Sequence, residues 1–81
     1  MSQSISSKTY KHFREGLKAR RLELNLSQAA LAKKLGQPQQ FVSRYELGER
    51  RLDVGEFIEI ALQLKIDPVR MIRELLAQRK K

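Results

Sequence analysis

The chain has 81 residues, room for one domain, and its 17 Lys and Arg against 9 Asp and Glu favour a polyanionic partner: DNA, RNA or an anionic membrane face. With no Cys and a single His, it excludes disulfides, thiol catalysis and a metal site built from Cys and His, and no cofactor is expected. No apolar run approaches the ~20 residues of a membrane span and no signal-peptide pattern opens the chain, so we expect a cytoplasmic protein.

Helical spacing of apolar residues predicts a first helix from about Lys8 to Leu24, preceded by a flexible, Ser-rich arm over residues 1–7. Its apolar stripe consists of Tyr10, Phe13, Leu17 and Leu24. Arg21 falls on the same stripe. Because a cation on an apolar face is costly, Arg21 needs either a carboxylate partner or an escape to water.

Two short helices joined by a tight turn come next. Ser27 is a good N-cap for a helix that continues through Ala29 to Leu35, and Gly36 can end it in a left-handed conformation. Pro38 has a φ preset for a first helical turn and opens a helix that runs to about Glu46. Such a pair is a helix-turn-helix, in which the second helix stands out from the body at a fixed angle.

The last third of the chain predicts two further helices. Asp53, with Glu56 three residues later, begins a fourth helix, whose buried stripe is expected to be Val54, Phe57, Ile58, Ala61 and Leu64. Asp67-Pro68 opens a fifth, with an apolar side of Val69, Ile72, Leu75 and Leu76, and residues 79–81 form a basic tail. The expected fold is all-α, a compact five-helix bundle with a helix-turn-helix DNA-binding domain over residues 8–78.

The outer face of the third helix, about residues 38–46, carries no acid and no hydrocarbon side chain. It gathers Gln39, Gln40, Ser43 and Arg44, opposite Phe41, Val42 and Tyr45. Gln can pair with adenine and Arg can fork onto guanine in the major groove. Any surface helix has a polar outer face, but the lack of acids beside the basic excess favours duplex DNA. The sequence contains no nucleophile–base pair and no cluster of metal-binding residues, so we expect that the protein is not an enzyme.

From Arg20 to Pro68 the sequence resembles the lambda-repressor-like, or Xre, family of helix-turn-helix regulators. The residues that carry this resemblance are Arg21, Leu26, Ser27, Gln28, Leu31, Ala32, Leu35, Gly36, Gln39, Gln40, Val42, Ser43, Glu46 and Gly48. The resemblance implies a five-helix fold, binding as a dimer to a two-fold operator, and transcriptional control, here expected to be repression.

The same resemblance assigns roles to individual residues. It implies base contacts from Gln39, Gln40 and Arg44, with Ser43 on the same face. It implies phosphate contacts, which fix register rather than read sequence, from Ser27, Gln28, Arg51 and, assisting, Arg50. Arg21 and Glu46 resemble the family's partly buried ion pair, which answers the puzzle of the cation on the apolar stripe; the alternative is that both side chains reach water.

Three residues depart from the family pattern. Leu47 replaces a polar residue that can reach a phosphate, and Pro38 removes a backbone N–H at the start of the third helix. Phe41 is large for its position and either contacts a sugar or thymine methyl, or covers the edge of the core.

A homodimer through helices four and five would join two half-sites and multiply their contacts. The candidates for partial exposure there are Leu62, Ile66, Met71 and Leu75; the alternative is that all four are core. An alternative function is an antitoxin that binds a toxin protein and autoregulates its own operon. A third is an adaptor or RNA-binding protein that reuses the fold.

Overall fold

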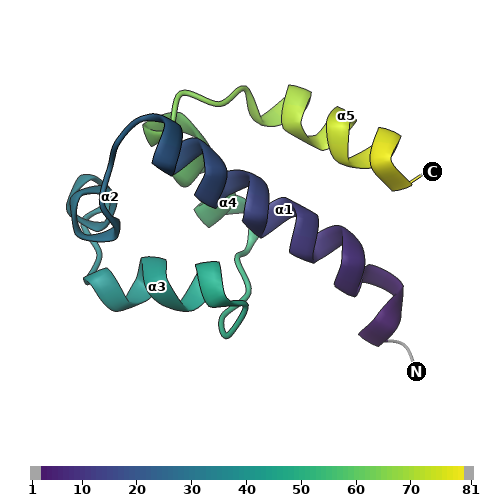
Figure 1. Ribbon diagram of the computed structural model, residues 1–81, viewed down its shortest axis with the longest axis horizontal. Coiled ribbons are helices and arrows are strands. Elements are labelled where there is room, and N and C mark those ends of the chain that lie inside the picture. The colour runs from purple at the N-terminus through teal and green to yellow at the C-terminus, as the bar shows by residue number, and fades with distance from the viewer. Residues whose placement is uncertain (1–2, 80–81) are drawn as a thin grey trace.

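The computed structural model describes residues 3–79, with side chains from Lys8 onward, and within this range the chain is helical with no strand. The helices are α1 (Gln3–Glu23), α2 (Gln28–Leu35), α3 (Gln39–Leu47), α4 (Val54–Gln63) and α5 (Pro68–Arg79) (Figure 1). The prediction of an all-α, five-helix fold is confirmed. No helix in the described range is long and apolar enough to cross a membrane.

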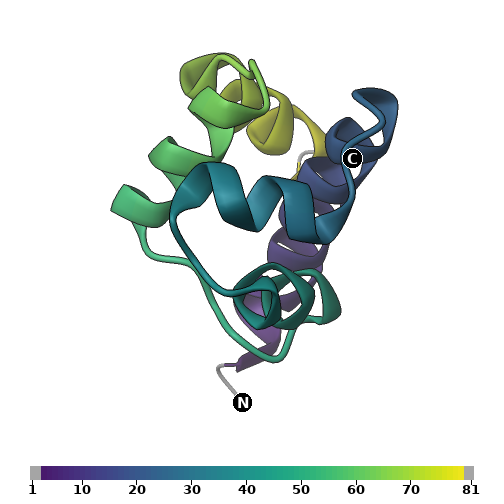
Figure 2. The same cartoon turned by 90° about the vertical axis from the view of Figure 1, so that its left-hand side faces the viewer.

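The long helix α1 lies in the middle of the molecule. It contacts α3 on one side and α5 on the other, while α2 contacts both α3 and α4 (Figures 1 and 2). Every helix contributes to one core, whose largest fully buried side chains are Leu17, Leu31, Val42, Tyr45, Ile60 and Leu64. Burying apolar area in this way drives folding, so the placement of α3 depends on what it buries.

The predicted helix ends are confirmed where local chemistry sets them. The Ser27 hydroxyl accepts the Ala30 N–H at 3.0 Å at the start of α2, and Gly36 ends it with φ +69°. At the start of α4, Asp53 and Glu56 exchange side chain to backbone hydrogen bonds of 2.7 and 3.0 Å, the capping box that the sequence predicts.

Two helix starts differ from the prediction. α1 begins at Gln3 rather than Lys8, because no Gly or Pro lies between Gln3 and Lys8 to stop the helix. Residues 1–2 of the predicted arm and residues 80–81 of the predicted tail lie outside the described range. Pro38 is the N-cap of α3 rather than its first helical residue, since its ψ of 155° is extended; a φ of −68° suits either position.

The buried faces of α4 and α5 also differ from the prediction. Three members of the predicted stripe of α4, Phe57, Ala61 and Leu64, are buried as expected. Ile60 is buried as well, whereas Val54 is 73% and Ile58 39% exposed. In α5 only Met71 is buried, because α5 touches α1 and α4 along one edge; Val69, Ile72 and Leu76 are exposed. Among the residues considered for a dimer surface, Met71 is therefore core, Ile66 and Leu75 are partly buried, and Leu62 is exposed.

Candidate nucleic-acid interface

The helix α3 lies along one edge of the molecule (Figure 1). Its two faces differ sharply in burial. Val42 and Tyr45 are fully buried and anchor its inner face. Three of the four predicted base-contacting residues, Gln39, Gln40 and Arg44, are exposed. Ser43 is partly buried, and its hydroxyl donates to the Gln40 carbonyl at 3.3 Å. The outer face therefore presents amide and guanidinium groups to solvent, with Leu47, 66% exposed, beside them at the end of α3.

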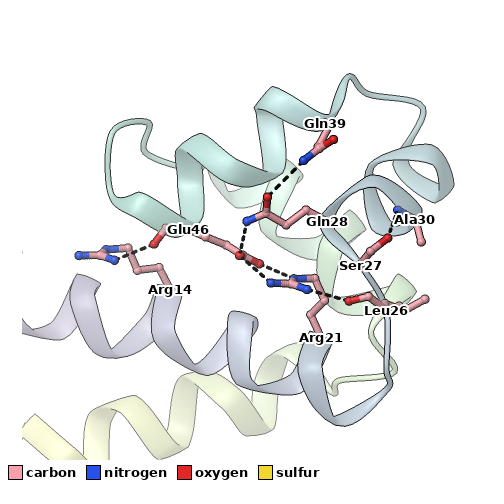
Figure 3. A network of polar contacts seen from close by, with 8 residues as sticks. All are labelled: Arg14, Arg21, Leu26, Ser27, Gln28, Ala30, Gln39 and Glu46. Atoms are coloured by element: carbon pink, nitrogen blue, oxygen red, sulfur yellow. Dashed lines mark hydrogen bonds and ion pairs between the residues drawn. The ribbon is translucent and has the colours of Figure 1, made fainter.

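A buried ion pair holds the end of α3 against α1. Arg21 donates from Nε to Glu46 Oε2 at 2.7 Å and from Nη2 to Oε1 at 3.0 Å, with side-chain exposures of 7% and 2% (Figure 3). Its Nη1 donates to the Leu26 carbonyl at 2.7 Å. The hydrogen bonds to Glu46 raise the pKa of Arg21. The prediction of a buried ion pair is therefore confirmed, and the alternative, that both side chains reach water, is wrong.

The same carboxylate links α2 to the start of α3. Gln28 Nε2 donates to Glu46 Oε1 at 2.9 Å, and Gln39 Nε2 lies 3.5 Å from Gln28 Oε1 (Figure 3). Gln28 therefore braces α3 from the first residue of α2. Its predicted phosphate contact, and that of Ser27, whose hydroxyl caps α2, remain predictions.

The loop between α3 and α4 holds its two arginines differently. Arg50 donates to both Glu56 oxygens at 2.9 and 2.7 Å, and its guanidinium lies 4.9 Å from the centre of the Phe41 ring. Arg51 is exposed, with its guanidinium 4.5 Å from the centre of the Tyr10 ring. Arg51 is thus the more available of the two for a phosphate.

Phe41 takes the second of its two predicted roles. Its ring meets the Tyr45 ring edge to face at 5.6 Å and lies beneath Arg50, so it covers the edge of the core.

The Tyr45 hydroxyl is buried and has no hydrogen-bond partner among the described residues, and burial raises the pKa of Tyr45.

Sequence reasoning missed two arginines of α1. Arg14 donates to the Glu46 carbonyl at 2.8 Å and Arg20 to the Leu64 carbonyl at 2.9 Å, so each reaches the end of another helix. The available signal was spacing: Arg14 and Arg21 are seven residues apart, which puts them on the same side of α1.

Comparison with known proteins agrees with this geometry. A protein-family model described as helix-turn-helix matches residues 17–71. Among solved structures, an XRE-family like protein from Pseudomonas syringae pv. tomato str. DC3000 is 35% identical in sequence, with a TM-score of 0.90. The alignment covers 95% of this chain and 94% of that one. No curated protein sequence matches the chain.

Replacing Arg21 by Met should strand the buried Glu46 carboxylate and lower the free energy of unfolding by ~3–5 kcal/mol in urea denaturation. The double variant Arg21→Met, Glu46→Leu should recover part of this loss, because no charge is left unpaired. Arg70→Met is the control: its pair with Glu74 is exposed and is worth about 0–1 kcal/mol. A loss for Arg21→Met no larger than for Arg70→Met would contradict the buried pair.

The Arg50 guanidinium, with the Asp53 N–H, lowers the pKa of Glu56 from 4.5 to about 2. The folded state therefore favours the carboxylate, so this contribution to stability is complete above pH 4.5 and is lost as the pH falls toward 2. In urea denaturation, the difference in free energy of unfolding between wild type and Glu56→Gln should become smaller as the pH falls from 4.5 toward 2. Glu59→Gln, an exposed change on the same helix, should give a difference that stays flat. A difference in free energy of unfolding that is independent of pH for Glu56→Gln as well would contradict the lowered pKa of Glu56.

Proposed function

Because the chain belongs to the Xre-type helix-turn-helix family of DNA-binding transcription regulators, we propose that it represses transcription as a dimer on a two-fold operator, with α3 in the major groove. The observation that carries this proposal is the contrast across α3: an inner face anchored by Val42 and Tyr45, and an outer face of exposed amide and guanidinium groups. Such groups form bidentate hydrogen bonds with adenine and guanine edges.

In this proposal the contacts divide into two kinds. Gln39, Gln40, Ser43 and Arg44 face the bases. Ser27, Gln28, Arg50 and Arg51 face the phosphates on either side. The exposed state of Arg51 favours it as the main phosphate contact of the loop, whereas Arg50 would have to share its guanidinium with Glu56.

A homodimer through α4 and α5 is supported by apolar side chains that the bundle leaves uncovered. On α4 these are Val54, Ile58 and Leu62, and on α5 they are Val69, Ile72 and Leu76. An apolar groove of about 270 Å³ between α1, α4 and α5 is lined by Tyr10, Phe13, Leu52, Val54, Phe57 and Ile72, among others. Exposed apolar patches of this kind mark protein contact sites.

The base assignment can be tested by selecting bound duplexes from a random pool. Arg44→Ala should abolish the preference at one position of each half-site, because a bidentate contact is worth ~1–3 kcal/mol of discrimination. Arg51→Ala is the matched control: it should weaken binding to all sequences about equally and flatten the salt slope by about one unit. A selected motif that Arg44→Ala leaves unchanged would rule out Arg44 as a base contact.

The dimer can be tested by sedimentation equilibrium. Ile72→Glu places a charge on the proposed interface and should raise the dimer dissociation constant at least about tenfold. Leu22→Glu, an equally drastic change at an exposed position of α1, should leave it unchanged. A wild-type chain that stays monomeric would reject the homodimer, and co-purification with a toxin from a neighbouring reading frame would instead favour the antitoxin function.

A further inference from the structure

Two side chains of α1 hold the end of α3, and both act on Glu46. Arg21 binds the Glu46 carboxylate, whereas Arg14, two turns earlier in α1, donates from Nη1 to the Glu46 main-chain carbonyl at 2.8 Å (Figure 3). Arg14 lies outside the segment matched by the family model, residues 17–71. The first contact fixes a side chain, but the second fixes the backbone of α3 itself.

The carbonyls at the end of a helix lack partners within it, and three of those in α3 are satisfied in two ways. The Gly48 N–H donates to the Arg44 and Tyr45 carbonyls, and the Glu49 N–H also donates to Arg44. Glu46 is left for the Arg14 guanidinium. A cation at this end also complements the helix dipole.

Gly48 provides the space in which Arg14 lies. It ends α3 with φ +83°, and a Cβ there would lie 2.9 Å from Arg14 Nε and 3.0 Å from Cζ. The guanidinium thus occupies the place that a side chain would take at this position. Arg14 therefore lies directly against the turn that contains the Arg44 carbonyl, the backbone from which the Arg44 side chain projects.

We propose that Arg14 is a positioning residue for DNA recognition: by holding the last turn of α3, it sets the direction in which Arg44 reaches a base edge. This inference rests on the proposed function. A turn that is already fixed before binding loses less conformational entropy when Arg44 makes a bidentate contact. A bidentate contact to a base also depends more strongly on geometry than a contact to a phosphate does. Loss of Arg14 should therefore reduce discrimination between bases rather than general affinity for DNA.

The chain provides matched controls for this inference. Lys11 and Lys18 lie three residues before and four residues after Arg14, which places them on neighbouring positions of the same side of α1. Both are exposed, and each change to Met removes the same single charge as Arg14→Met. Met keeps an aliphatic side chain of similar length, so the substitutions remove the polar group and little else.

The experiment measures the affinity of each variant for the duplex that wild type selects, and for the same duplex altered at the base pair that depends on Arg44. Thermal melting fixes a temperature at which every variant is folded. Arg14→Met should lower the ratio of the two affinities about tenfold, as for the loss of one charge-assisted hydrogen bond, with the salt slope unchanged. Lys11→Met and Lys18→Met should leave the ratio unchanged, and Arg14→Lys, which keeps a donor, should restore part of it.

Three results would overturn the inference. Equal weakening on both duplexes, with the salt slope flatter by about 0.9, would make Arg14 a phosphate contact. The same loss of ratio in all three Met variants would reduce the effect to net charge. A lower melting temperature with an unchanged ratio would make Arg14 purely structural. A wild-type chain with no preferred duplex would instead overturn the proposed function, and this inference with it.

Discussion

The buried pair between Arg21 and Glu46 is the constraint on which the arrangement of α3 depends. A buried charge is strongly destabilising unless it is paired and its hydrogen bonds are satisfied, so Glu46 must face α1. Helical periodicity then decides the rest: Val42 turns toward the core, while Gln40 and Arg44 fall on the far side of α3. One interaction therefore fixes the rotation of α3 about its axis and, with it, which side chains face outward.

The basic residues of the chain perform two different tasks, and net charge does not separate them. Arg14, Arg20 and Arg21 donate to main-chain carbonyls of other elements, and Arg50 is held by Glu56. These four guanidinium groups support the fold. Fewer cations therefore remain for phosphates than the 17 Lys and Arg residues suggest. The salt dependence of binding should follow the remaining exposed cations, because only released counterions contribute to it.

Sequence reasoning succeeded where the physics is local. Ser27, Gly36 and the Asp53–Glu56 box set helix ends through hydrogen bonds within a few residues, and the resemblance named the partner that Arg21 required. It failed where tertiary contacts decide. Arg14 and Arg20 reach carbonyls 32 and 44 residues away. Spacing puts Arg14 on the same side of α1 as Arg21, but it does not identify the carbonyl that either arginine meets. The phosphate and base contacts remain predictions: contacts within the chain show which side chains are free to bind, as for Arg51 beside Arg50, but not what they bind.

The error over the buried face of α4 has a physical cause that bears on assembly. Apolar residues cover more than half of the circumference of this helix, and Glu56, Glu59 and Gln63 occupy the rest, so periodicity alone could not place the buried stripe within that wide apolar arc. An apolar arc this wide is more than a single neighbouring element covers. Here α2 and α5 cover one side, while Val54, Ile58 and Leu62 remain exposed. The surplus of apolar surface that periodicity cannot assign is thus the best reason to expect a second copy of the chain against α4.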